Sequence, residues 1–262
     1  MEKDILGNKK IAVVGAGHMG RAIIKGLVNC KKITRSNIFV SNKSNNILLV
    51  QKADYILIAV KPFSVKGVLQ EIKSFTGNKI ILSVAAGVGI KMIEKILGKN
   101  QKIIRLMPNI PVSENKGVIG FFTNKNISSS EKNQIKNLIS ILGKVFVVNK
   151  EKDIDFLTLI TGCGPAISSY FINLISDYAI KQGFLKNQSI NLSLNMFKGT
   201  INYLENNNLK LPELIKSVTT KGGVTEVILS SLNKNEVKKL FGKSMDDGYH
   251  KIQQIKEKIK LS

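Results

Sequence analysis

The sequence predicts an α/β fold in which a doubly wound, mainly parallel sheet is followed by an all-helical region. Short apolar runs alternate with helical apolar spacing from residue 10 to residue 148, a pattern typical of βαβ units. From Asp153 onward the apolar residues recur at helical spacing only, as at Phe171, Leu174 and Tyr178. We therefore expect two domains, one spanning residues 1–149 and the other spanning residues 150–262.

The individual elements follow from local composition. The run 56–60 is entirely apolar and is closed by Lys61-Pro62, which fits a strand buried on both faces. Three serines at 128–130, followed by Glu131, predict the start of a helix. On such grounds we expect strands at 10–14, 38–41, 56–60, 79–84, 102–106, 117–122 and 144–148, and helices at 21–28, 65–73, 90–97, 130–142, 165–181 and 224–232.

The composition is that of a globular protein with a large excess of lysine. Of the 262 residues, 43% are hydrophobic and 22% are charged, which leaves enough apolar material for a core. The net charge of +22 suggests nucleic acid, but only Arg21, Arg35 and Arg105 are arginines and the lysines are scattered along the chain. Lysine, isoleucine and asparagine all have A/T-rich codons, so genome composition accounts for the excess. A general attraction for an anionic cofactor and substrate is the alternative, and we expect no nucleic-acid partner.

Membrane, secretory and metal-binding classes are not favoured. The longest apolar stretch, 80–90, contains Ser83, Gly87 and Gly89 and is shorter than the roughly 20 residues that a bilayer requires. The first residues are mixed in charge and lead directly into a strand, unlike a signal peptide. Cys30 and Cys163 fit neither a disulfide framework nor a zinc site. We expect a cytoplasmic protein with no bound metal and no membrane partner.

A glycine-rich turn lies between the first expected strand and the first expected helix. In a Rossmann-type fold the first glycine of Gly-x-Gly-x-x-Gly permits a tight turn, the second admits a pyrophosphate, and the third allows close helix–strand packing. The following helix N-terminus offers unpaired N–H groups to phosphates. We predict that the cofactor is bound by Gly15, Ala16, Gly17, His18, Met19 and Gly20. His18 is expected to contribute its backbone rather than its imidazole.

The end of the second expected strand indicates which dinucleotide is bound. An acidic residue there would bond the ribose 2′-hydroxyl of NADH and repel a 2′-phosphate. This chain instead has Ser41, Asn42 and Lys43, and no carboxylate occurs until Asp54. Hydroxyl, amide and ammonium groups suit a phosphate, so we favour NADPH, with NADH possible and a solvated turn as the structural alternative.

Five further motifs follow one another in order along the chain. They are Ala59-Val60-Lys61-Pro62, Ser83-Val84-Ala85-Ala86-Gly87, Arg105-Leu106-Met107-Pro108-Asn109, Thr161-Gly162-Cys163-Gly164-Pro165-Ala166 and Val218-Thr219-Thr220-Lys221-Gly222-Gly223-Val224-Thr225. Together they resemble the pyrroline-5-carboxylate reductases, which catalyse the last step of proline biosynthesis. The resemblance covers nearly the whole chain.

The resemblance implies a role for each motif. Ala59, Val60, Lys61 and Pro62 would lie beside the nicotinamide ribose, Ala85, Ala86 and Gly87 around the nicotinamide, and Met107 and Asn109 near the reactive end of the cofactor. The substrate would be bound by Thr220, Gly222, Gly223, Val224 and Thr225. Within this loop the N–H groups around Gly223 would hold the substrate carboxylate, since a Gly-Gly turn opening a helix suits an anion. Thr225 would be catalytic, through a hydrogen bond to the imine nitrogen.

This chemistry asks little of side chains. A protonated cyclic imine is already electrophilic, so the protein mainly aligns the reacting atoms and excludes water. The absence of an evident acid–base pair is consistent with this, and His250 is expected at the surface. Cys163, Ile167 and Lys221 depart from the family pattern. So does the short stretch between Asn42 and Asp54, which predicts a sheet shortened at that edge and puts cofactor affinity in question.

Two other functions stay open on the sequence alone. One is a reductase of the same fold acting on another imine or keto acid, although the helix 165–181 lacks the Lys-x-x-x-Asn pattern of β-hydroxyacid dehydrogenases. The other is a non-catalytic paralogue that keeps the scaffold. Whichever of these functions the protein has, its apolar segment 161–180 is too rich in Ile, Phe and Tyr for one small domain to cover. We expect a homodimer or a higher homo-oligomer, with the active site completed at a two-fold interface.

Overall fold

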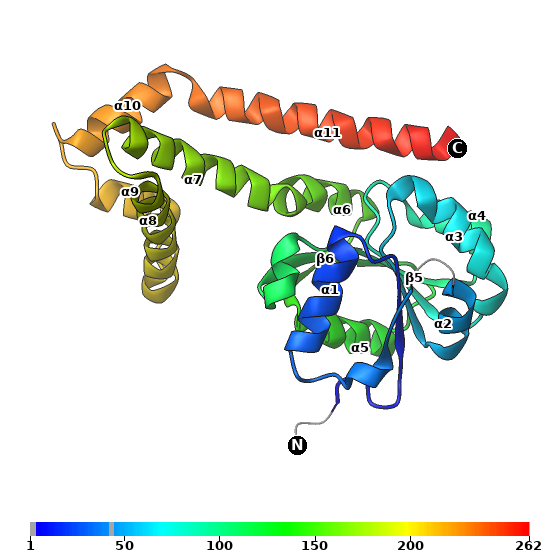
Figure 1. Ribbon diagram of the computed structural model, residues 1–262. Coiled ribbons are helices and arrows are strands. Elements are labelled where there is room, and N and C mark those ends of the chain that lie inside the picture. Colours follow the sequence, from blue (N-terminus) through cyan, green and yellow to red (C-terminus); the bar gives the residue numbers. More distant parts are fainter. Residues whose placement is uncertain (1–3, 42–44, 262) are drawn as a thin grey trace. The chain divides into compact units, whose positions relative to one another are not determined.

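The computed structural model describes residues 4–41 and 45–261, and the chain forms two compact units. The first unit extends as far as Gly164 and also includes the chain from Gly248 onward, and the second is Pro165–Asp247. The first unit holds a sheet with helices on both faces, and the second is helical (Figure 1). The fold class expected from the sequence is thereby confirmed.

Seven strands form one sheet in the order β2-β1-β3-β4-β5-β6-β7. Their bounds are β1 Ile11–Val14, β2 Ile38–Val40, β3 Tyr55–Ile58, β4 Ile80–Ser83, β5 Lys102–Met107, β6 Gly117–Thr123 and β7 Gly143–Val147. All neighbouring pairs are parallel except β5 and β6, which are antiparallel. Only a short 3-10 turn, η4 (Ile110–Glu114), separates those two strands, too little chain for the crossover that a parallel pair requires.

Helices cover the two faces of the sheet and bury two apolar clusters. One face packs against α1 (His18–Asn29) and α5 (Ser129–Ser140), and the other against α2 (Asn46–Lys52), α3 (Val65–Ile72) and α4 (Ile90–Leu97). Strand residues alternate between the clusters: Val13 belongs to the first and Val14 to the second. Short turns complete this unit at η1 Arg35–Asn37, η2 Pro62–Ser64 and η3 Lys73–Phe75.

The segment after β2 is a helix that the sequence did not predict. Over the described residues 45–54, α2 alone links β2 to β3, so β2 is the edge strand. The ammonium group of Lys79 donates to the carbonyls of Val50, Gln51 and Ala53 at 2.8, 3.0 and 2.5 Å. The Val50 carbonyl also accepts from the Ala53 N–H at 3.3 Å, and Lys79 adds a donor for the other two carbonyls at the helix end. The shortened connection is therefore held by a side chain from the start of β4.

The all-helical region begins inside the first unit. The helix α6 (Glu151–Leu157) and the π-helical turn η5 (Thr158–Gly162) follow β7, and the end of α11 (Val237–Leu261) packs beside them. The ring of Phe156 stacks on that of Tyr249, with 4.8 Å between centroids. The expected division at residues 149 and 150 thus marks where strands end, whereas the compact units divide after Gly164.

The second unit has no apolar core of its own. It comprises α7 (Gly164–Lys181) from Pro165 onward, α8 (Lys186–Asn207), α9 (Leu211–Ser217), α10 (Val224–Lys234) and the first part of α11. Within Pro165–Asp247 the only buried residues are Ser176, Ser189 and Ser193. Large apolar side chains such as Tyr178, which is 64% exposed, lie on its surface. A unit of this kind needs another surface to cover it.

One apolar helical run is longer than the sequence predicted. Glu151–Lys181 is long and apolar enough to cross a membrane by length and composition, and only 6% of its apolar window is buried. An uncovered helix of an assembling protein has the same properties. The run overlaps the segment 161–180 that the sequence analysis expected at an interface.

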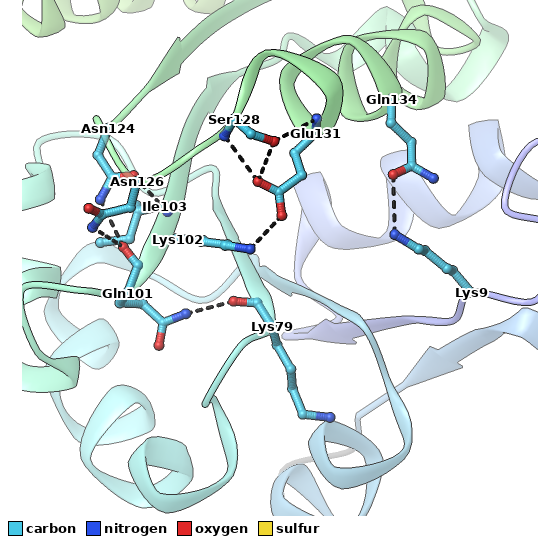
Figure 2. A network of polar contacts seen from close by, with 10 residues as sticks. All are labelled: Lys9, Lys79, Gln101, Lys102, Ile103, Asn124, Asn126, Ser128, Glu131 and Gln134. Atoms are coloured by element: carbon cyan, nitrogen blue, oxygen red, sulfur yellow. Dashed lines mark hydrogen bonds and ion pairs between the residues drawn. The ribbon is translucent and has the colours of Figure 1, made fainter.

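At the amino ends of the strands a polar network joins β4, β5 and α5 (Figure 2). Gln101 donates to the carbonyl of Lys79, and Asn124 donates to the carbonyl of Gln101. Glu131 accepts from Lys102 at 2.6 Å and forms a reciprocal capping box with Ser128, at the helix start that the sequence predicted. Burial raises the pKa of the Glu131 carboxyl, but the bonds from Lys102 and Ser128 outweigh it and lower the pKa to about 2.

This low pKa predicts a pH-dependent contribution to stability. A carboxyl whose pKa falls on folding stabilises the protein fully above its unfolded value of 4.5, and the contribution is lost as the pH falls toward about 2. Glu131→Gln should lower the free energy of unfolding by about 1 kcal/mol at neutral pH, since the pair is partly screened by solvent. The difference from the unsubstituted protein should shrink below pH 4.5. Urea unfolding at several pH values measures this, with the exposed Glu205→Gln as the control; a difference that stays constant with pH would contradict it.

Candidate functional site

The candidate cofactor site lies where the strand order reverses, between β1 and β3. In open α/β sheets this crevice at the carboxyl ends of the strands is where ligands bind. The turn after β1 and the turn after β3 meet here: a Cβ added to Gly15 would lie 2.7 Å from the carbonyl carbon of Ala59. Gly15 also has a φ of +108°, which L side chains rarely adopt. Packing and backbone conformation both require glycine at this position.

The other two glycines of the turn differ in what they face. A Cβ on Gly20 would lie 2.0 Å from the Gly15 carbonyl oxygen, so close packing of α1 on β1 explains this glycine. A Cβ on Gly17 would meet nothing within 4 Å. The protein itself does not require glycine there, and the open space suits a ligand that approaches the backbone. Gly17 begins α1 without a side-chain cap, which leaves the first N–H groups of the helix available to phosphates.

Within the same turn, Ala16, Gly17 and His18 are exposed and Met19 is half-buried. The turn therefore presents its backbone to solvent at the helix N-terminus, as the nucleotide prediction requires. Whether His18 contributes its imidazole is untested and stays a prediction.

Ser41 is placed differently from what its predicted role suggests. Its side chain is only 3% exposed, and its hydroxyl donates a short hydrogen bond to the Asn46 side-chain oxygen. The Asn46 amide in turn donates to the Glu71 carboxylate at 2.9 Å. In this geometry the Ser41 hydroxyl ties β2 to α2 and α3. Asn42 and Lys43, which were also predicted to bind the 2′-phosphate, lie outside the described residues.

The remaining cofactor candidates lie at the carboxyl ends of β3, β4 and β5. Ala59 is buried and its N–H donates to the Val14 carbonyl at 2.8 Å; Val60, Lys61 and Pro62 continue from it toward the surface. Ala85, Ala86 and Gly87 follow β4, and Gly87, with a φ of +76°, faces Ile255 of α11.

Met107 and Asn109 follow β5, and both are buried. The Asn109 oxygen accepts from the Val118 N–H at 2.8 Å, so this side chain already holds β6. The turns after four strands thus share one edge of the sheet, while the Asn109 side chain has a structural task.

The candidate substrate loop lies in the second unit, between α9 and α10. Gly222 has a φ of +72°, and a Cβ on Gly223 would lie 2.3 Å from the Thr220 hydroxyl oxygen. The Gly223 N–H donates to the Thr220 carbonyl at 2.9 Å, and the Gly222 N–H donates to the Glu226 carboxylate at 2.6 Å. Glu226 was not singled out from the sequence.

The next two N–H groups along the chain differ from those of Gly222 and Gly223. Val224 and Thr225 occupy the first turn of α10, and among the described residues no hydrogen bond is formed by their N–H groups. Those two N–H groups are the ones open to an anion. The Thr225 hydroxyl also forms no hydrogen bond with a described residue, and Gly223 begins α10 without a side-chain cap. Thr225 therefore does not cap α10.

Sequence reasoning missed a buried charge cluster behind β5. Arg105 is 2% exposed and donates to Glu151 at 2.9 Å, and Lys256 donates to Asp155 at 2.6 Å. Glu151 also accepts from the Ile90 N–H at 2.7 Å and so begins α4. The signal available in the sequence was the four-residue spacing of Glu151 and Asp155, which puts both on one helix face. No group of three potential metal-binding side chains occurs in the described parts of the chain.

Two family models match the chain. One, described as NADP oxidoreductase coenzyme F420-dependent, matches residues 10–87, and one described as pyrroline-5-carboxylate reductase dimerisation matches residues 151–255. These ranges correspond to the cofactor turns and to the helical region with the substrate loop.

Individual relatives agree with the family models. The chain is 34% identical over 237 residues to a pyrroline-5-carboxylate reductase of Aquifex aeolicus, covering 84% of this chain and 88% of that protein. A pyrroline-5-carboxylate reductase of Staphylococcus haemolyticus is 28% identical and covers 92% and 96%. Among solved structures, the pyrroline carboxylate reductase of Plasmodium falciparum with NADP bound has 31% identity, a TM-score of 0.89, and coverage of 95% of this chain and 98% of that one.

Because Gly17 and Gly20 have different surroundings, substitution by alanine should mainly weaken NADPH binding at Gly17 and mainly lower stability at Gly20. Gly17→Ala fills the open space and should weaken NADPH binding about tenfold or more, with a loss of stability under about 1 kcal/mol. Gly20→Ala forces α1 away from β1 and should lower the melting temperature by several degrees, consistent with about 2 kcal/mol.

Fluorescence titration with NADPH and thermal unfolding of both variants measure these effects. Equal losses of affinity with equal losses of stability would contradict the distinction.

Proposed function

Because the chain belongs to the pyrroline-5-carboxylate reductase family, we propose that it reduces 1-pyrroline-5-carboxylate to proline with NADPH. The observation that carries this proposal is the coincidence of two features on one chain. In the first unit the turn after β1 leaves open space at Gly17, and in the second unit α10 begins without a side-chain cap. We also propose a cytoplasmic location, since Cys30 and Cys163 are free thiols.

Each unit contributes binding through its backbone. The first N–H groups of α1 would hold the pyrophosphate, and the turns after β3 and β4 would border the rest of the cofactor. The N–H groups of Val224 and Thr225 would hold the substrate carboxylate, because those of Gly222 and Gly223 already have partners within the loop. NADPH supplies the hydride. The protein aligns the imine carbon with it and excludes water.

The Thr225 hydroxyl would orient the substrate ring nitrogen. It stands one residue into α10 and has no partner among the described residues, which supports a role in binding rather than in folding. No charged acid is required, since the imine is protonated before it accepts hydride.

The protein forms homo-oligomers, as the match of residues 151–255 to a dimerisation family indicates. We propose that the assembly is a dimer in which the helical units cover one another. The support is the second unit itself, in which no apolar side chain is buried. Its exposed aromatic and aliphatic side chains would supply the apolar interface of an obligate dimer. In that arrangement the active site would be completed at the interface, as the sequence analysis expected.

Oxidation of NADPH in the presence of 1-pyrroline-5-carboxylate tests the proposed function. The purified chain should consume NADPH only when this substrate is added, and should prefer NADPH to NADH. Turnover of other cyclic imines or of keto acids, with none of 1-pyrroline-5-carboxylate, would favour a reductase of different specificity. No turnover of any of these substrates by a chain that binds NADPH would favour a non-catalytic paralogue.

Removal of the Thr225 hydroxyl should impair catalysis without impairing folding. Thr225→Ala should lower kcat/KM by about tenfold or more, since roughly 1.4 kcal/mol of transition-state stabilisation corresponds to each factor of ten. The melting temperature should stay unchanged, because the hydroxyl caps no helix. Thr225→Ser keeps the hydroxyl and serves as the control. A variant that loses stability but keeps its turnover would overturn the assignment.

A further inference from the structure

An open cavity of about 970 Å³ lies in the first unit between α3, α4, α6 and the end of α11. This volume is within the range of small-molecule binding sites. Of the residues predicted to bind cofactor or substrate, only Gly87 lines it. The proposed reaction therefore leaves most of this cavity without a role.

The wall of the cavity is strongly positive. Seven lysine and arginine side chains line it, against the two carboxylates of Glu151 and Asp155. Both carboxylates are already engaged, Glu151 by Arg105 and the Ile90 N–H, and Asp155 by Lys256. Of the lining lysines, the structure records no ion pair with a described residue for Lys73, Lys91, Lys95 and Lys152. These four lysines are exposed to solvent, and a cavity whose wall carries an excess of one charge attracts ions of the opposite charge.

A buried guanidinium nitrogen points to the same kind of ligand. Arg105 lines the cavity although only 2% of it is exposed, and its Nη2 forms no hydrogen bond with any described residue. The nearest carboxylate oxygen, Oδ1 of Asp155, is 3.6 Å away and also lacks a hydrogen-bond partner. A buried donor without a partner is costly, and an anionic acceptor would satisfy it.

The remaining lining is apolar. Met92 and Ile96 of α4 and Ile259 of α11 contribute to the same cavity. We propose that the cavity binds an organic anion that carries at least two negative groups on an apolar body, a phosphorylated metabolite of nucleotide size. The lysines and Arg105 hold its charges, and Met92 and Ile96 contact its body. This site shares only Gly87 with the predicted cofactor site.

Isothermal titration calorimetry on the NADPH-saturated enzyme tests the proposal. Saturation with NADPH keeps the Gly15–Gly20 turn occupied, so that added anions report on other sites. The probes are inorganic tripolyphosphate, which offers charge alone, and ATP, which adds an aromatic body. Both should bind in low salt, and ATP should bind more tightly. Absence of binding by both at millimolar concentration would overturn the proposal, as would equal affinities, because the apolar side would then have no part.

A matched pair of charge variants locates the site. Lys91→Gln/Lys95→Gln removes two cavity lysines four residues apart on α4, and Lys132→Gln/Lys136→Gln removes two lysines with the same spacing on α5. The first variant should weaken ATP binding about fivefold or more, and the second should leave it nearly unchanged. Turnover with NADPH should be the same in both. Equal weakening by the two variants would overturn the proposal, since general attraction to a basic protein would then explain the binding.

Discussion

The guanidinium group of Arg105, on the inner strand β5, is buried where this strand meets α4, α6 and the end of α11. Removing such a charge from water costs several kcal/mol, and the cost is offset only if partners are held in place around it. Glu151 provides one partner at 2.9 Å and, by accepting from the Ile90 N–H, also fixes the start of α4. Asp155 lies on the same face of α6 and forms an ion pair with Lys256 of α11. One buried cation thus ties three helices to a strand, and it explains why the first unit includes α6 and the end of α11.

The local parts of this fold were predictable, whereas the long-range parts were not. The expected helix 90–97 and the strand 10–14 agree with α4 and β1 almost to the residue, because apolar runs and glycine turns are local signals. Helix α2 was missed because its apolar residues, 47–50, are consecutive and so show no helical period. In the structure Ile47 and Leu48 are exposed, whereas Val50 is fully buried. The pairing of Asp155 with Lys256 joins residues about a hundred positions apart, and no spacing rule could indicate it.

The candidate site shows the same division. The backbone conformation of the glycines follows from the turn itself, as the positive φ of Gly15 and Gly222 shows, while their binding roles stay predictions. Two side chains that were predicted to bind the cofactor form hydrogen bonds within the protein. Ser41 and Asn109 are engaged within the protein, the first with Asn46 and the second with the Val118 N–H. Their partners lie only five and nine residues along the chain, in α2 and β6, but the first belongs to a helix that was not predicted and the second is a backbone N–H, for which no residue type gives a signal.

The two candidate binding turns have a common construction, although they lie in different units. In each, one glycine has a left-handed backbone (Gly15, Gly222) and another is packed too closely for a side chain (Gly20, Gly223). Each turn leads into a helix whose first N–H groups lack side-chain caps. The turns are therefore shaped by backbone sterics, and what they present to a ligand is mainly amide hydrogen. Under the proposed function, in which main-chain groups hold the pyrophosphate and the substrate carboxylate, the side chains around these two turns can vary widely without loss of those contacts.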